Sequence, residues 1–252
     1  MSWILAVETS TEWCSVALGR VAADGAFECC SRHEHTGARS SSRVLPAVGE
    51  VLAEAGIRLA DCAAVAFGAG PGSFTGLRTA CGVAQGLAFG AELPVIPVNV
   101  LMACAESARN AIPLPADASV LVALDARMDE AYSACFRWQD EEWRETGATR
   151  VGAPDAVVRP EGEFWLAGNG AVVFGERLAV AAQASRVLPD AMPDARAMVA
   201  IGLRALARGE TIDAADAMPI YVRDKVAQTI AEREAVAAEK LKAAQTAQGA
   251  TP

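Results

Sequence analysis

The sequence predicts an α/β protein of two lobes, in each of which a mixed sheet is flanked by helices. Short apolar runs with strand-like patterning alternate with longer segments of helical periodicity. The order of three strands, a helix, a strand and a helix occurs twice along the chain. The 252 residues are 52% hydrophobic, which is enough for one large domain or two small lobes with real cores.

The first predicted lobe covers residues 1–112. Pro46 fits a helix only near its start, so we expect the first helix to begin around residues 43–45. Gly56 stands where a left-handed glycine would end that helix. The expected elements are strands at 3–10, 13–20 and 26–30, this helix up to residue 55, a strand at 62–67, a helix at 74–90, a strand at 94–98 and a helix at 100–111.

The second predicted lobe covers residues 113–225, and a tail follows at 226–252. The tail is rich in Ala, Glu, Lys and Gln, which predicts a solvated helix or a disordered segment. In the lobe we expect strands at 119–126, 130–138 and 142–151, a short helix near 154–159, a strand at 164–170, and helices at 171–184 and 194–209.

The repeated order of elements is typical of one large superfamily. Two such lobes packed side by side form the duplicated actin-like (ribonuclease-H-like) fold of actin, Hsp70 and the sugar kinases. No repeat of the sequence itself accompanies the repeat of elements, so this step is an analogy at the level of the fold.

Composition excludes several classes of function. A net charge of −9 without any Lys/Arg run argues against nucleic-acid binding by the chain alone. No uncharged stretch reaches the roughly 18 residues of a membrane-spanning helix, and the N-terminus lacks the basic region of a secretory signal. Seven cysteines without a C-x-x-C pair predict small buried hydrophobic side chains in a reducing compartment. We therefore expect a cytosolic protein.

Three turns lie where actin-like proteins bind a nucleotide. The first hairpin offers three hydroxyls in a row but no glycine, and Glu8 stands where ATP-using members have an aspartate. The corresponding turn of the second lobe holds Asp125 and Arg127, which could equally form a structural pair. These degenerate loops, each of which could also be a plain structural turn, comprise Glu8, Thr9, Ser10, Thr11, Asp125, Gly168 and Gly170.

The stretch GAGPGSFTGLR (68–78) raises the question of a catalytic loop. It lacks the lysine of a Walker A motif and the outer glycines of a nucleophile elbow. Ser73 is instead placed to cap the helix that follows, by accepting a hydrogen bond from a backbone N–H. The exposed N-terminus of that helix could also receive an anion.

Gly82, Gly86 and Gly90 follow along one face of the same helix. Each interior glycine costs about 0.5–1 kcal/mol relative to alanine, so something must offset the cost. A glycine stripe allows another backbone to approach closely. The partner is either the protein's own sheet or a helix of another chain.

The two histidines, His33 and His35, do not make a metal site. A catalytic zinc or iron needs about three ligands, and no convincing cluster of His, Cys, Asp and Glu stands near them. A Ser-His-Asp triad would have to use this pair. We expect no metal.

Several stretches together resemble one known family. They are ILAVETSTEWCSVAL, HT followed by RVLPAV, VAFGAGPGSFTGLRTACGVAQGLA, ALDARMDEAY and PIYVRDKVA. Over residues 3–230, and most specifically over 66–88, the chain resembles the TsaB (YeaZ) family of bacterial tRNA-modification proteins.

The resemblance implies an actin-like fold and a role in making N6-threonylcarbamoyladenosine at position 37 of tRNAs that read codons starting with A. It implies a non-catalytic subunit that pairs with the catalytic subunit TsaD, works with the ATPase TsaE, and forms homodimers when alone. It implies contact with tRNA only through the complex and no cofactor of its own, while a weakly bound or interface-bound nucleotide stays open.

In the resembled family the interface is built from helices that match about 41–55 and 74–90 here. The candidate interface residues are Arg43, Leu45, Val48, Ser73, Phe74, Arg78, Gly82, Gly86 and Gly90. The chain departs from the family where residues 37–42 (GARSSS) precede the first of these helices, so that its entry is longer. Alternative functions are an actin-like kinase or ATPase that uses Glu8 and Asp125, and, with less support, a metal-dependent glycopeptidase.

Overall fold

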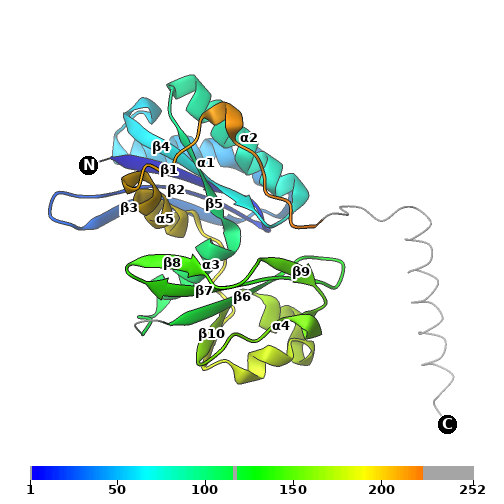
Figure 1. Cartoon of the computed structure of the whole chain (residues 1–252). Coiled ribbons are helices and arrows are strands. Elements are labelled where there is room, and N and C mark those ends of the chain that lie inside the picture. The colour runs from blue at the N-terminus through cyan, green and yellow to red at the C-terminus, as the bar shows by residue number, and fades with distance from the viewer. Residues whose placement is uncertain (1, 116–117, 224–252) are drawn as a thin grey trace, which may run out of the picture. The chain divides into compact units, whose positions relative to one another are not determined.

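Two mixed sheets with the same strand order form the frame of the chain (Figure 1). The computed structural model describes residues 2–115 and 118–223, and the predicted tail at 226–252 lies outside them. The first sheet has the order β3-β2-β1-β4-β5, and the second has the order β11-β10-β6-β7-β8 with β9 beside β7. In both sheets the first three strands pair antiparallel, and the two strands on the other side of the first strand pair parallel. The predicted duplicated actin-like fold is confirmed.

The strands follow the apolar runs of the sequence. The first sheet contains β1 (Trp3–Glu8), β2 (Trp13–Val21), β3 (Phe27–His35), β4 (Cys62–Gly70) and β5 (Val95–Asn99). The second contains β6 (Ser119–Asp125), β7 (Ala131–Gln139), β8 (Glu142–Glu145), β9 (Arg150–Gly152), β10 (Phe164–Ala167) and β11 (Arg186–Leu188). The single strand expected at 142–151 is therefore two short strands.

Helices α1 (Ser40–Ala55) and α2 (Phe74–Ala91) cover one face of the first sheet. Alternate strand residues such as Leu5, Val7 and Phe67 point toward these helices and are fully buried. The helices bury one stripe each and leave the opposite stripe in solvent, as amphipathic periodicity predicts.

Two helices cross between the lobes. Helix α5 (Ala195–Ala207), which sequence order assigns to the predicted second lobe, packs on β1, β2 and β4 of the first sheet. Helix α3 (Val100–Ala111) packs against β6 of the second sheet and against α5. A division at residue 113 therefore describes the strands but not these helices, and the chain up to Val222 forms one compact unit.

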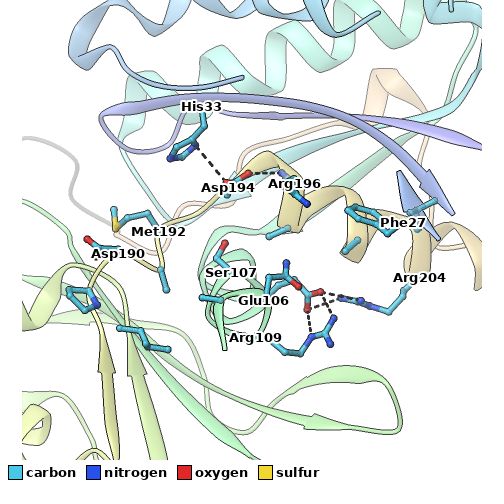
Figure 2. A pocket seen from close by; sticks show the side chains of 18 of the residues that line it. Phe27, His33, Glu106, Ser107, Arg109, Asp190, Met192, Asp194, Arg196 and Arg204 are labelled. Carbon is cyan, nitrogen blue, oxygen red and sulfur yellow. Dashed lines mark hydrogen bonds and ion pairs between the residues drawn. The ribbon is translucent and has the colours of Figure 1, made fainter. Parts of the chain in front are cut away.

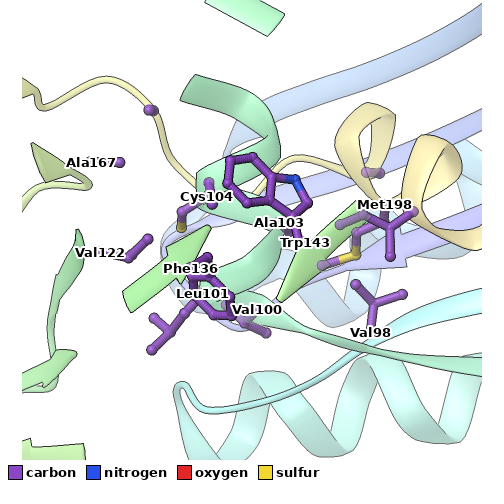
Figure 3. Close-up of a cluster of buried hydrophobic side chains, with 14 of the residues drawn as sticks. Val98, Val100, Leu101, Ala103, Cys104, Val122, Phe136, Trp143, Ala167 and Met198 are labelled. Atoms are coloured by element: carbon purple, nitrogen blue, oxygen red, sulfur yellow. The ribbon is translucent and has the colours of Figure 1, made fainter. Parts of the chain in front are cut away.

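The crossing helices share one continuous core. Ile4 and Ala66 of the first sheet, Val122 and Phe136 of the second, and Met198 of α5 belong to a single cluster of buried side chains. Figure 3 shows the part of this cluster around α3, where Leu101 and Cys104 lie beside Phe136 and Trp143. The burial of apolar surface that stabilises each sheet thus depends on both lobes.

Helix α1 begins at Ser40, earlier than Pro46 suggests. Hydroxyl groups stabilise the entry: Ser42 Oγ donates to the carbonyl of Arg39 at 2.8 Å, and Ser40 Oγ donates to the carbonyl of Gly37 at 3.2 Å. Pro46 stays inside the helix and removes one backbone donor. The stretch 37–42 is thereby divided into one 3₁₀ turn at 37–39 and the first residues of α1.

The helix expected at 171–184 is mostly broken. Only α4 (Gly170–Phe174) is α-helical, and two 3₁₀ turns follow it at Gly175–Arg177 and Ala179–Gln183. Gly175 has a φ of 54°, a left-handed conformation that ends the helix. The expected helix near 154–159 is likewise a single 3₁₀ turn at Pro154–Ala156. In the described part of the chain, no helix is both long and apolar enough to cross a membrane.

All seven cysteines are free thiols, as expected, and four of them are buried. Burial raises the pKa of the Cys14, Cys29 and Cys62 thiols to about 11.

Because the thiolate is the reactive form, we expect these cysteines to react slowly with a disulfide reagent at pH 7.5. In urea all seven should react rapidly. A time course of colour release with Ellman's reagent, with and without urea, checks this. Fast labelling of Cys14 and Cys62 in the folded protein would contradict it.

Candidate partner interface

The outward face of α2 carries an open glycine stripe. Gly82, Gly86 and Gly90 are exposed, and a Cβ added at any of them would meet no described atom within 4 Å. The opposite face of the helix packs on the sheet through Ala80 and Ala84. The protein's own sheet is therefore not the partner of the stripe, and this alternative for its role is wrong.

Apolar side chains stand in solvent on α2 and on the helix beside it. Phe89 is 78% exposed on α2, and Leu45 is 53% exposed on the neighbouring helix α1. Ser73 and Phe74 are exposed at the start of α2. A face that combines exposed apolar side chains with a smooth glycine track is typical of a protein–protein contact.

Two of the predicted interface residues, Val48 and Arg43, make contacts within the chain itself. Val48 is only 4% exposed and packs in the core beneath α1, so its place in a contact surface is wrong. Arg43 is held by the carboxylates of Glu34 and Glu50, at 2.6 and 2.8 Å. Those carboxylates raise the pKa of Arg43 further above its usual range.

Residues 218–222 extend the exposed surface at the start of α2, and sequence reasoning did not place them there. Arg78 Nε donates to the Tyr221 hydroxyl at 3.0 Å, and its guanidinium lies 3.8 Å from the centre of the Phe74 ring. Ile220 N donates to the carbonyl of Ala69 at 2.7 Å. The sequence feature that could have indicated this segment is the PIYVR motif. Its exposed apolar residues follow neither the period of a helix nor that of a strand.

The glycine-rich loop 68–78 packs against the first hairpin turn rather than opening toward a ligand. Ser73 N donates to the carbonyl of Ser10 at 2.8 Å, and Thr9 Oγ1 donates to the carbonyl of Gly76 at 2.7 Å. A Cβ on Gly76 would collide with the carbonyl of Thr9. Ser73 is the N-cap residue of α2, but in the described chain its side chain makes no capping hydrogen bond, so the predicted Ser73 cap is wrong.

Glu8 is fully buried where β1 ends. Its Oε1 accepts a hydrogen bond from Ser10 N, and its Oε2 lies against Gly68, where a Cβ would collide with it. Burial raises the pKa of the Glu8 carboxyl to about 7, although the hydrogen bonds from Ser10 oppose the shift. The carboxyl group thus serves the contact between β1 and β4, with Thr9 and Ser10 also buried beside it.

The raised pKa of Glu8 predicts a pH dependence of stability. The usual pKa is 4.5, so the folded state favours the neutral carboxyl, whose contribution is complete below pH 4.5 and is lost as the pH rises through about 7. The loss amounts to at most about 3 kcal/mol, at 1.36 kcal/mol per pKa unit.

We expect Glu8→Gln to remove this slope between pH 5 and pH 8. Urea unfolding of both proteins across that range measures it. Parallel slopes for the native protein and the variant would show that Glu8 ionises normally.

The second turn joins the two lobes. Arg127 contacts Asp125, with Nη1 3.3 Å from Oδ2, so the predicted structural pair is confirmed. Arg127 Nη2 also lies 2.6 Å from Oε1 of Glu12 in the first hairpin. Sequence reasoning missed Glu12, since nothing in its local pattern indicates a partner that is 115 residues away.

The remaining loop also has a structural role. A Cβ on Gly168 or Gly170 would collide with the backbone of Ala123, and Asn169 Oδ1 accepts a hydrogen bond from Asp125 N at 2.9 Å. These two glycines therefore allow the third loop to lie against the end of β6. The three loops expected from nucleotide-binding relatives contact one another or the neighbouring backbone.

The two histidines flank Trp13 rather than a metal. The His33 ring stacks on Trp13 with centroids 4.5 Å apart, and the His35 ring meets it edge-on at 5.3 Å. His33 Nδ1 lies 3.9 Å from Asp194 Oδ2. Within residues 2–115 and 118–223, no three His, Cys, Asp or Glu side chains gather as metal ligands.

Similarity to known proteins covers nearly the whole chain. The model of the family described as "TsaD: tRNA N6-adenosine threonylcarbamoyltransferase" matches residues 34–245. The "tRNA threonylcarbamoyladenosine biosynthesis protein TsaB" of Escherichia coli is 39% identical over 242 residues, which is 89% of this chain and 96% of that protein. The TsaB protein of Haemophilus influenzae is 35% identical, over 88% of this chain and 94% of that protein.

A solved structure agrees. "YeaZ from Pseudomonas aeruginosa" has 38% sequence identity and a TM-score of 0.78, and the match covers 88% of this chain and all of that one. The chain belongs to the TsaB (YeaZ) family. The matching family model carries the name of the transferase, so by itself it does not separate the catalytic chain from its relatives. The TsaB relatives do so, because they match over almost their full length.

Membership of the TsaB family confirms the resemblance drawn from the sequence motifs. It leaves open which residues meet a partner, and there the open stripe on α2 is the most specific feature of this TsaB member.

Proposed function

We propose that this chain works in threonylcarbamoyladenosine biosynthesis as a non-catalytic subunit that docks onto TsaD through the outward faces of α1 and α2. The observation that carries the proposal is the glycine stripe, whose three members are exposed and where an added Cβ would meet no described atom within 4 Å. The names of the relatives supply the pathway.

In this proposal, contacts with the partner helix offset the helix stability that the glycines cost. Each glycine costs about 0.5–1 kcal/mol in helix stability, and no packing against the described residues of its own chain offsets that cost. A partner helix lying along the stripe would come close enough for backbone contact, and Leu45 and Phe89 would be buried beside it. Burial of those two side chains would contribute roughly 1.5–3 kcal/mol each.

Other subunits of the complex carry out catalysis and contact the tRNA in this proposal. Catalysis is assigned to TsaD, and the buried position of Glu8 supports this because its carboxyl faces Gly68 rather than a cleft. We further propose that TsaE joins the pair, that the chain alone forms homodimers through the same face, and that tRNA is reached only through the complex. A cytoplasmic location and the lack of a cofactor of its own complete the proposal.

An omission assay tests the function. Purified machinery is supplied with tRNA, ATP, threonine and bicarbonate, with or without this chain, and modified nucleoside is measured after digestion. We expect modification to fall sharply without the chain. Full-rate modification in its absence would refute the proposal, and turnover by the chain without TsaD would favour the alternative of an enzyme.

A further inference from the structure

A cavity of about 990 Å³ lies beside helix α5 (Figure 2). Its walls come from the β2–β3 hairpin, the end of α3, the segment between β11 and α5, and one face of α5 itself. The α5 residues on the wall include Ala197, Ala200 and Arg204, which recur at helical spacing. The opposite face of α5 packs on the first sheet, and the lining residues Ala191 and Ala197 belong to the shared core, so the cavity borders that core.

Two arginines are held on this wall by one buried carboxylate. Glu106 is fully buried and accepts hydrogen bonds from Arg109 Nη2 at 2.8 Å and from Trp143 Nε1 at 2.6 Å. Arg204 Nη1 donates to the same carboxylate at 3.3 Å. Both guanidinium groups also lie over the ring of Trp138, at 4.1 and 5.2 Å from its centre. The two side chains are therefore fixed in position before any ligand arrives.

This cluster keeps a positive charge and unused donors. Burial opposes ionisation of Glu106, but its hydrogen bonds and the arginine charges outweigh that effect and hold its pKa below the usual range. One carboxylate against two guanidinium groups leaves a net charge of +1. Arg204 Nη2 is buried and lies 3.1 Å from Glu106 Oε2, but without hydrogen-bond geometry to any described acceptor. Ser107 Oγ, also on the cavity wall, is buried and has no hydrogen-bond partner among the described residues.

The two ends of the cavity differ in chemistry. Phe27 of the hairpin lies near Arg204 (Figure 2), and Phe27 and its ladder partner Val21, each 41% exposed, give the cavity an apolar wall. The other end carries the carboxylates of Asp190 and Asp194. Asp194 and Arg204 are ten residues apart along α5, which places them about 15 Å apart at 1.5 Å per residue.

We propose that this cavity binds a small organic anion. Its carboxylate or phosphate group would lie against Arg109 and Arg204, and its apolar body against Phe27. A hydrogen-bond-donating group would face Asp194. Guanidinium groups bind carboxylate and phosphate with the same forked geometry, so both anions fit the chemistry. A mostly apolar cavity with a few convergent polar groups is the usual form of a small-molecule site. The proposal does not depend on the role proposed for α1 and α2.

Titration calorimetry on the full chain tests it, with phenyl phosphate, benzoate, inorganic phosphate and benzyl alcohol as probes. We expect saturable binding of at least one of the two aromatic anions with a Kd below about 1 mM. Inorganic phosphate should bind more weakly, and benzyl alcohol should show no binding in that range. The ratio between phenyl phosphate and benzoate tells which anion the arginines prefer.

Two variants locate the binding. Phe27→Ala removes an exposed hairpin side chain. Arg204→Lys keeps the charge but removes the forked guanidinium, which can donate two hydrogen bonds to one anion. Each substitution should raise the Kd of the aromatic anion about tenfold or more, as expected for the loss of one favourable contact. The matched controls, Phe89→Ala and Arg144→Lys, change exposed residues outside the cavity and should bind as the native chain does.

Melting temperatures recorded beside the titrations show whether Arg204→Lys is folded, and Phe27→Ala decides the question if it is not. The proposal is overturned if neither aromatic anion saturates, or if Phe27→Ala and a folded Arg204→Lys bind as tightly as the native chain.

Discussion

Gly86→Leu should remove binding to TsaD and weaken the proposed homodimer, while leaving the melting temperature of the monomeric chain unchanged or slightly higher. A Cβ added at this position would meet no described atom of its own chain within 4 Å, and leucine is favoured over glycine in a helix by about 0.5–1 kcal/mol. In the proposed complex the same side chain stands between two backbones. Overpacking of this kind costs about 1–3 kcal/mol or more, which is about 5- to 150-fold or more in Kd. Co-purification and calorimetry with TsaD measure the effect.

The matched control for this experiment is Ala207→Leu, which adds a large side chain at an exposed helical position on α5. It should bind TsaD normally. If Gly86→Leu also binds normally, the outward face of α2 is not the interface. If the variant instead unfolds, the open surroundings of Gly86 are not those described.

Gly76→Ala should destabilise the chain severely, by roughly 3 kcal/mol or more, because the added methyl group would collide with backbone that cannot move alone. Gly76 lies at the start of α2, where its Cβ position coincides with the carbonyl of Thr9. The loss would also break the hydrogen bond from Thr9 Oγ1 to the Gly76 carbonyl. Urea unfolding monitored by circular dichroism measures the change.

Gly82→Ala, in the same helix, supplies the comparison. Its added methyl group meets no described atom, so the alanine should stabilise the chain by about 0.5–1 kcal/mol. Opposite signs for these two substitutions would show that the glycines of one helix serve two purposes. Equal effects would mean that the close contact between Gly76 and the first hairpin is absent in solution.

Periodic features of the sequence predicted the fold well, because burial of one face of a helix or strand places apolar residues at a regular spacing along the sequence. Most strands and the long helices α1, α2, α3 and α5 appear close to where apolar spacing placed them, although β11 was not predicted and the strand expected at 142–151 is two strands. The helix at 171–184 failed because a left-handed turn at Gly175 ends it, and apolar spacing carries no information on that conformation.

Residues that act through distant partners were not predictable in the same way. Val48 has the spacing of an interface residue and of a core residue alike, and only packing decides between them. Glu12 and residues 218–222 gain their roles from contacts more than a hundred residues away in sequence. The arginine pair on Glu106 was missed for the same reason, since Arg204 lies 98 residues from its carboxylate.

The crossing of α5 has a consequence for synthesis on the ribosome. The last strand of the first sheet ends at Asn99, but the helix that covers one face of that sheet begins at Ala195. At 5–20 residues per second, roughly a hundred intervening residues take about 5 to 20 seconds to translate. During that interval the nascent first sheet presents an uncovered face bearing Ile4 and Ala66. The growing chain should therefore be a substrate for chaperones that bind apolar surface, and it should be released from them only when α5 arrives.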